Sequence, residues 1–293
     1  MTDQMTHASA RLSMPDFVQI DLWRDALAAF DRDVRPDLSN APDLLGAVPL
    51  AAFGAALLQP QHYFKRAHAF LPKMASDQTQ ISWTGSSGPV LLETSLAFVN
   101  HVVAACGGPK ALGSAQALDF GVGWGRLARL FLKYMPPTQL DGCDAWDVSL
   151  QHARDCGIKN RLVKSDVYLR ELPFDSGSFD LIYAFSIFTH LSEKSFRGCL
   201  AGFSKMLKPS GKAIFTIRPN HYWSLRSGLK NQAALMRSTK FEFIPSNGME
   251  DFGDTSVTTP WFKAALADAG LKLVGFEWSP VDALQVIAIT ERA

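Results

Sequence analysis

The stretch that most constrains this 293-residue chain is a glycine-rich turn at residues 117–126, with the sequence ALDFGVGWGR. Apolar residues lead into the turn and the helix-forming run 127–132 follows it, so the segment predicts a strand, a tight turn and a helix. Glycines in such a turn let the backbone come within contact distance of a ligand. Two carboxylates, Asp144 and Asp166, follow at the ends of the next two candidate strands, where open α/β sheets bind ligands. The pattern indicates a nucleotide-like ligand.

The spacing of the glycines separates two classes of ligand. A dinucleotide-binding turn has the pattern G-x-G-x-x-G and seats a pyrophosphate on the helix that follows. Here Gly121, Gly123 and Gly125 are spaced one residue too tightly for that pattern. Asp119 also precedes the first glycine by two residues, and a carboxylate there would repel a pyrophosphate. It suits a ligand with a cationic end, such as S-adenosylmethionine, which carries an ammonium and a sulfonium.

Residues 112–292 resemble the class I S-adenosylmethionine-dependent methyltransferase family. Five motifs carry the resemblance: Leu118–Gly125, the acid that ends Leu140–Asp144, the acid that ends Val163–Asp166, the Leu-Pro-Phe … Phe-Asp stretch Leu172–Ile182, and the helix end and turn Met206–Lys212. Each motif alone is only suggestive, but the five occur in the family's order and at its usual spacings.

The residue patterns agree with an α/β fold. Short apolar runs such as 181–184 are typical of buried parallel strands, and helical patterns at 127–134, 148–156 and 196–207 lie between them. Near the end, Thr259 and Pro260 predict the start of a helix that Gly270 closes. The strand candidates 271–278 and 283–290 follow, and the short turn between them requires an antiparallel pair. The resemblance implies a Rossmann-like, seven-stranded, mostly parallel sheet with this antiparallel pair at its C-terminal end.

The resemblance also implies roles for individual residues. Gly121, Gly123 and Gly125 would keep side chains away from the methionine moiety, Asp119 would support its ammonium, and Asp144 would accept both ribose hydroxyls. A set of further residues is assigned to cofactor binding on the same basis: Trp83, Arg126, Ala145, Asp166 at the adenine amino group, Val167 and Phe185. Helix capping is the competing explanation for the acids, and Asp147 fits it better than Asp144 does.

Two histidines are candidate catalytic bases. The segment 184–191 leaves the fourth strand at its carboxyl end, where the acceptor should lie, and it contains His190. His221 follows the fifth strand beside Tyr222 and Trp223. A histidine at either place can instead serve only as a hydrogen-bonding partner of nearby backbone. The Asn-Pro-Pro-Tyr motif of base-amino methyltransferases is absent at the fourth strand, which disfavours amino methylation of nucleic acids and says nothing against oxygen, the acceptor atom that we favour.

Residues 1–110 lie outside the main resemblance and predict a helical cap, with residues 111–293 forming the methyltransferase domain. Helical patterns cover 14–33, 43–58, 62–75 and 89–105. Between them we expect a loop at 81–88, whose glycines, hydroxyls and Trp83 either close over the cofactor or cap a helix.

Composition fits a globular protein, with 47% hydrophobic and 19% charged residues. The four cysteines form no C-x-x-C pair and no cluster has metal-ligand spacing, which predicts reduced thiols, a cytoplasmic protein and no metal. The longest apolar run, 44–58, holds Pro49 and is shorter than the ~20 residues that span a bilayer, so we expect no membrane span. The polar N-terminus is unlike a secretory signal.

Net charge is +1, but its distribution is uneven. No acid occurs between Glu193 and Glu242, a stretch with ten bases: Lys194, Arg197, Lys205, Lys208, Lys212, Arg218, Arg226, Lys230, Arg237 and Lys240. The group Arg218, Arg226, Lys230 and Arg237 predicts an anionic small molecule or glycan as substrate. RNA is an alternative substrate, although no RNA-binding module accompanies the fold. A non-catalytic scaffold with a cofactor fold is the alternative outside enzymes, and the intact acids and glycines argue against it. Oligomeric state is left open.

Overall fold

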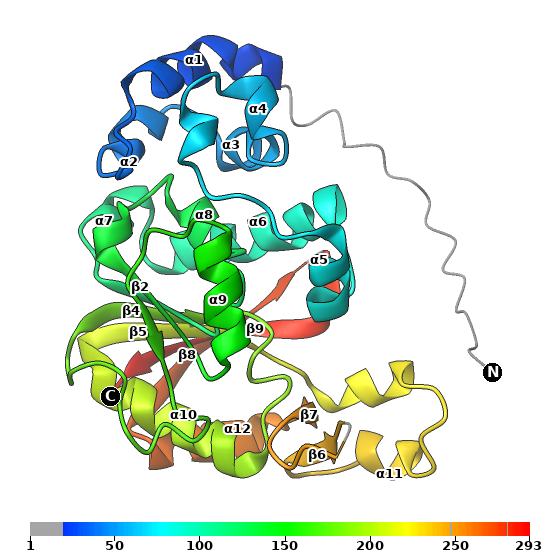
Figure 1. Ribbon diagram of the computed structural model, residues 1–293. Coiled ribbons are helices and arrows are strands. Elements are labelled where there is room, and N and C mark those ends of the chain that lie inside the picture. Colours follow the sequence, from blue (N-terminus) through cyan, green and yellow to red (C-terminus); the bar gives the residue numbers. More distant parts are fainter. Residues whose placement is uncertain (1–19, 247, 280) are drawn as a thin grey trace.

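The computed structural model describes residues 20–246, 248–279 and 281–293, and its centre is a seven-stranded sheet (Figure 1). The strand order is β3-β2-β1-β4-β5-β9-β8. The strands are β1 (Ala117–Phe120), β2 (Leu140–Asp144), β3 (Leu162–Lys164), β4 (Phe179–Ala184), β5 (Leu207–Ile217), β8 (Leu271–Ser279) and β9 (Asp282–Arg292).

Strands β1 to β5 run parallel, and β9 pairs antiparallel with both β5 and β8. The predicted seven-stranded, mostly parallel sheet with an antiparallel C-terminal pair is therefore confirmed. The carboxyl ends of the parallel strands meet at one edge, which is the edge that binds ligands in folds of this kind. That edge carries Asp144, Phe185 and the glycine turn, because they follow β2, β4 and β1 directly.

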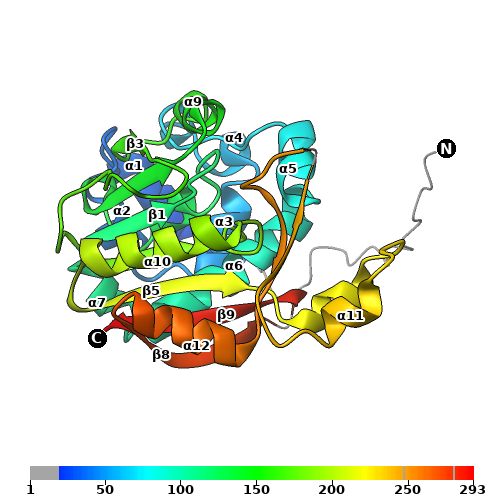
Figure 2. The same cartoon turned by 90° about the horizontal axis from the view of Figure 1, so that it is seen from below.

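Helices cover both faces of the sheet (Figures 1 and 2). One face is covered by α6 (Gly88–Ala105), α8 (Ala128–Phe131) and α9 (Asp147–Asp155), and the other by α10 (Glu193–Met206) and α12 (Thr259–Asp268). Side chains alternate between these layers, since Leu118 and Ile182 belong to the core under α10 while Ala117 and Leu181 belong to the core under α6.

The N-terminal layer is helical, as predicted, but its helices are shorter. Its elements are η1 (Ile20–Trp23), α1 (Arg24–Asp33), α2 (Ala41–Leu45), α3 (Leu50–Ala56), α4 (Pro60–Tyr63), η2 (Ala67–Ala69), α5 (Asp77–Thr84) and α7 (Pro109–Gly113). Pro49 caps α3 and breaks the helix expected over 43–58. The helix expected over 62–75 is wrong, because the Asp31 carboxylate accepts hydrogen bonds from the backbone of residues 65–67 and holds it outside a helix. Residues 14–19 of the first predicted helix lie outside the described residues.

Two helix boundaries after the glycine turn and before β8 also differ from expectation. Helix α8 has only four residues, since bonds from Leu130 to Leu127 and from Tyr134 to Phe131 span three residues and tighten the chain on both sides. The cap of α12 is Thr258 rather than Thr259, and its side chain accepts from the Trp261 backbone N–H. These differences in helix boundaries leave the predicted order of elements along the chain unchanged.

Helix α6 is long and apolar enough, by length and composition, to cross a membrane. In the fold it packs against α3, α5, α8 and the last two strands. Its buried side chains, among them Phe98, Val99 and Val102, lie in the same core as the sheet. Its hydrophobicity is therefore accounted for by the interior it helps to form.

An insertion between β5 and α12 projects from the rest of the fold. It contains η4 (Asn220–Leu225), α11 (Gln232–Met236) and a two-stranded hairpin, β6 (Glu242–Pro245) with β7 (Gly253–Ser256). Figure 2 shows this hairpin running along the edge of the molecule from α12 towards α5. The hairpin therefore lies across the ligand-binding edge of the sheet.

Candidate functional site

The glycine turn is built so that neighbouring side chains touch its backbone. Gly121 has φ +78°, and a Cβ there would collide with the Ile187 side chain. Gly125 has φ +87°, and a Cβ there would collide with Ile158. Gly125 is thus required by packing, whereas a Cβ at Gly123 would meet only the Trp83 ring, at 3.7 Å. Of the three predicted glycines, Gly123 therefore lies on the open side of the turn, and Gly121 and Gly125 are packed against isoleucine side chains.

Asp119 is buried at the end of β1, at 3% exposure, and its Oδ2 has no hydrogen-bond partner among the described residues. Burial raises the pKa of this carboxyl to about 7, against the opposing effect of the Tyr183 hydroxyl and the Arg126 charge. Neither the Tyr183 hydroxyl nor Oδ2 makes a hydrogen bond of normal geometry, although the two groups face each other. A buried acceptor without a partner is suited to a cationic ligand group.

Asp144 lies at the end of β2 with its carboxylate turned into the glycine turn. Its Oδ2 accepts from the Gly123 N–H at 3.1 Å and its Oδ1 from the Trp146 N–H at 3.0 Å. Burial raises its pKa, and these backbone bonds oppose that shift. Each carboxylate oxygen keeps a further lone pair, so two hydroxyls can still be accepted. Asp147 is the first residue of α9 rather than its cap, and it pairs with Lys164.

Asp166 follows β3 and is paired with Arg170 at 2.9 Å. The Arg170 hydrogen bond lowers the pKa of this carboxyl. Ala145 follows β2 and Val167 follows Asp166, and both are half-buried at the same edge. The structure brings these three residues to the edge where the family keeps its adenosine, and their contact with adenosine remains a prediction.

Arg126 and Phe185 form one contact at the centre of the edge. The Arg126 guanidinium lies over the Phe185 ring at 4.4 Å, and Phe185 in turn stacks on Phe98 of α6 at 4.6 Å. Burial lowers the pKa of Arg126 to about 10, while Asp119 and Asp282 raise it. The guanidinium therefore stays charged at neutral pH.

Trp83 reaches the glycine turn from α5, not from a loop. Residues 81–84 form the last turn of α5, which ends at Gly85 with φ +80°, so the loop expected over 81–88 is reduced to its second half. The Trp83 ring is 39% exposed and packs edge-on against His152, 5.2 Å between centroids. Trp83 therefore lies beside the glycine turn, as predicted, but it belongs to a helix and not to a loop.

His190 is held rigidly beside the hairpin. Its Nδ1–H donates to the Gly253 carbonyl at 2.7 Å, and its ring stacks on Phe252 at 5.0 Å and 16°. Burial lowers its pKa to about 4, helped by the charge of Arg218. The imidazole is thus neutral at pH 7, and because Nδ1 carries the proton, Nε2 is an acceptor. His221 is exposed on η4. Its ring lies near the Trp278 ring, with 5.9 Å between centroids, and its contacts are separate from those of His190.

The predicted basic group does not act as one free cluster. Asp254 of β7 pairs with Arg218 at 2.8 Å and with Arg226 at 2.9 Å, so one acid outside the acid-free stretch is shared by both arginines and offsets part of their charge. Arg218 is buried, donates to the Thr189 carbonyl and lies over the Tyr222 ring. Folding thus brings the hairpin acid to both arginines, and their contact with an anionic substrate stays a prediction.

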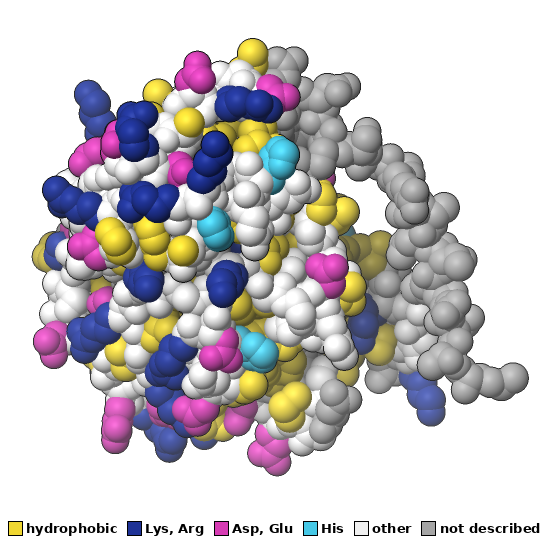
Figure 3. Space-filling model, turned by 45° about the horizontal axis from the view of Figure 1, so that its top comes forward, with side chains coloured by type: hydrophobic (Ala, Val, Ile, Leu, Met, Phe, Trp, Pro, Cys, Tyr) yellow, Lys and Arg dark blue, Asp and Glu magenta, His cyan; other side chains and the backbone are white. Residues whose placement is uncertain are grey.

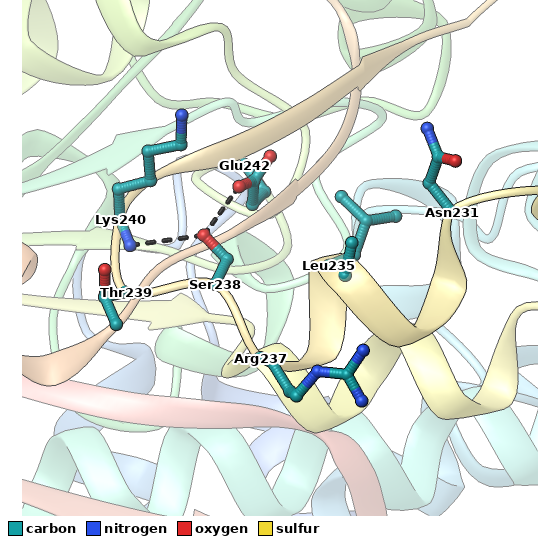
Figure 4. A pocket seen from close by; sticks show the side chains of 8 residues that line it. Asn231, Leu235, Arg237, Ser238, Thr239, Lys240 and Glu242 are labelled. Carbon is teal, nitrogen blue, oxygen red and sulfur yellow. Dashed lines mark hydrogen bonds between the residues drawn. The ribbon is translucent and has the colours of Figure 1, made fainter.

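Lys230 and Arg237 of the predicted group remain exposed on the insertion. Arg237 and Lys240 line an open groove of about 420 Å³, in which the Ser238 hydroxyl donates to Glu242 (Figure 4). On the face drawn in Figure 3, basic and acidic side chains are interspersed, without a broad surface of one sign.

Sequence reasoning missed several residues at this edge. Trp146, 44% exposed beside Asp144, packs on Phe252, and its place two residues after the acid was the signal available in the sequence. Ser186 adopts φ +64° just after β4, where its N–H donates to Thr216 and its hydroxyl accepts from Gln285. Such strain in a non-glycine residue gathers at functional sites and has no signal in sequence.

These residues fit S-adenosylmethionine. An unpartnered buried carboxylate, a second carboxylate with free lone pairs and an open glycine turn lie together at one edge. When bound, the cofactor supplies a methyl group already activated by its sulfonium. The chain then contributes alignment and exclusion of water.

Comparison with known proteins supports this fit. Residues 117–211 match the family described as methyltransferase domain. A putative S-adenosylmethionine-dependent methyltransferase from Listeria monocytogenes has 11% identity, covering 68% of this chain and 98% of its own, with a TM-score of 0.51. One from Clostridium acetobutylicum has 13% identity, covering 73% and 96%, with a TM-score of 0.50. At these identities the two structures support the fold alone.

No curated protein matches the chain significantly. The matched domain, the sheet order and the site nevertheless agree with one another. Residues 117–211 therefore form a methyltransferase domain, and the chain has the fold of S-adenosylmethionine-dependent methyltransferases and is an enzyme of methyl transfer.

Proposed function

We propose that this methyltransferase acts on a small molecule or glycan and that an oxygen atom accepts the methyl group. The observation that carries the proposal is His190, whose neutral imidazole has its Nδ1–H tied to Gly253. A free Nε2 can accept a hydrogen bond from a hydroxyl and orient its oxygen. With a pKa of about 4 the imidazole is a weak base, so its contribution is positioning more than proton removal.

We also propose that any negative charge on the acceptor lies towards the insertion. Lys230, Arg237 and Lys240 are exposed there, whereas Arg218 and Arg226 are already paired with Asp254. The groove lined by Arg237 and Lys240 supports this narrower version of the anionic proposal. Because Glu242 is acidic and accepts from Ser238 in the same groove, the proposal is limited to anionic ligands that do not occupy the Ser238 end.

The test is a screen with methyl-labelled S-adenosylmethionine against phenols, sugar hydroxyls and amines, each in neutral and acidic forms. We expect label transfer to a hydroxyl acceptor. The variant His190→Gln should lower kcat with little change in the affinity for S-adenosylhomocysteine.

His221→Gln is the matched control, because it removes an exposed histidine of the insertion that does not contact the Gly253 carbonyl. Equal kcat for native protein and His190→Gln would contradict the role given to His190. Transfer to amines alone would contradict the choice of oxygen.

A further inference from the structure

The β6–β7 hairpin contacts a cofactor loop that is remote from it in sequence. The Phe252 ring packs on the Trp146 ring with 5.2 Å between centroids. Trp146 lies two residues after Asp144 and donates its backbone N–H to that carboxylate. The hairpin thus covers the loop that carries the acid predicted to bind ribose.

A second contact joins the hairpin to the loop after β3. The Tyr168 hydroxyl donates to the Asp251 carboxylate. Tyr168 lies two residues after Asp166, the acid predicted to bind the adenine amino group. Two independent contacts therefore place one end of the hairpin over the predicted adenosine position.

The same hairpin also contacts the segment of His190. Phe252 forms a β-bridge with Leu191, stacks on the His190 ring, and is followed by the Gly253 carbonyl that binds Nδ1. Ser192 donates to Asp251 on the same side. One short segment, 251–253, thus touches loops that follow β2, β3 and β4.

The two ends of the hairpin are held very differently. All four residues of β7 are buried, and Asp254 is fixed by Arg218 and Arg226. Towards the turn, residues 248–250 are exposed, and Met249 is 39% exposed. There the contacts with the cofactor loops are a partly exposed aromatic pair and a hydrogen bond. Residues 251–253 are fixed to residues 190–192 by the contacts named above, whereas these two side-chain contacts hold the tip against the loops after β2 and β3. Contacts that are few and partly exposed are the ones that open locally.

The geometry points to a strap over the cofactor: Phe252 and Trp146 wall the adenosine end of the site, the Tyr168–Asp251 bond latches them, and the cofactor exchanges when the hairpin tip lifts. The proposal rests on the cofactor assignment for the same site. Since the tip also contacts His190, closing the strap sets the imidazole at the moment the cofactor is enclosed.

The test measures the association and dissociation rates of S-adenosylhomocysteine by surface plasmon resonance on the full chain. Tyr168→Phe removes only the latch hydroxyl, so both rates should rise together, dissociation by about fivefold to tenfold for one lost hydrogen bond. Phe252→Ala removes the ring that packs on Trp146 and stacks on His190, so the dissociation rate should rise at least as much. A merely structural loss would lower the bound fraction without speeding association.

Trp278→Ala is the control, because it removes an indole that is 56% exposed at the other end of the same edge, on β8. Its rates should match those of the native protein. Rates within twofold of native for both Tyr168→Phe and Phe252→Ala, with native binding intact, would overturn the strap alone. Absence of binding by the native protein would overturn the cofactor site together with the strap.

Discussion

Asp119 should make cofactor binding depend on pH in a range where carboxylates seldom titrate. In the free protein the pKa of Asp119 is about 7, because burial disfavours its charge. The ammonium of a bound ligand beside Oδ2 would favour the ionised form. Binding should therefore release a proton below pH 7, and affinity should rise with pH.

The size of the effect follows from that pKa. At pH 5 about 1% of Asp119 is ionised and at pH 7 about half, so affinity should rise roughly fiftyfold, or ~2.3 kcal/mol at 1.36 kcal/mol per pKa unit. The interval ends at pH 7 because a ligand α-amino group titrates just above it. Linkage acts on stability too: the folded pKa is raised above the unfolded value, so stability present near pH 4 is lost as pH rises through 7.

Calorimetric titration with S-adenosylhomocysteine at pH 5, 6 and 7 measures the affinity. Buffers with different ionisation enthalpies at pH 6 should report release of about 0.9 proton by the native protein, since at that pH about nine-tenths of Asp119 is protonated. Asp119→Asn is the control, because the amide keeps the shape and cannot titrate. Any dependence that it retains belongs to Asp144, whose pKa is also raised. Identical pH profiles for the two proteins would refute the reasoning.

Three further outcomes can be checked on the purified protein. Asp144→Ala should weaken S-adenosylhomocysteine binding tenfold to over a hundredfold, for ~1.5–3 kcal/mol of charge-assisted hydrogen bonding, with an unchanged circular dichroism spectrum; native affinity in calorimetry would exclude the ribose role. The pKa of His190 is lowered to about 4, so it makes stability rise with pH from about 4 to 6.5, opposite in sign to Asp119; His190→Gln should remove that rise in urea unfolding, and an unaltered profile would contradict it. Arg218→Gln leaves Asp254 short of its buried partner and should cost about 3 kcal/mol, whereas Arg226→Gln, with half of its side chain exposed, should cost under about 1 kcal/mol; equal losses for the two would show that burial does not decide the effect.

The succession of strands, turns and helices along the chain could be predicted from local patterns, because each strand and turn carries its own signal, whereas the seven-stranded sheet was implied by the family resemblance. Apolar runs, the glycine turn and the two acids fixed the site's elements without any knowledge of long-range contacts. Helix lengths in the N-terminal layer could not be predicted, since Asp31 holds residues 65–67 from more than thirty positions away. Tertiary contacts of that kind override periodicity.

The positions of the cofactor acids at one edge could be predicted because strand ends share an edge, while their contact with the cofactor stays a prediction. The pairing of Arg218 and Arg226 with Asp254 could not be predicted, because the acid lies far from both arginines in sequence. The Phe252–Trp146 contact joins residues more than a hundred positions apart and follows from the path of the hairpin alone. Contacts made by the insertion could therefore not be predicted from sequence motifs.

The core under α6 has a consequence for how the chain can be divided. It runs without a break from Phe30 and Phe53 in the N-terminal layer, through Phe131 of α8, to Ile287 of β9. A fragment beginning at residue 111 would keep every family motif yet expose to water the part of the sheet face that α6 covers. The portion recognisable as a methyltransferase is therefore smaller than the portion that can stand alone, and Phe30 and Phe53 belong to the solubility of the enzyme as much as to its shape.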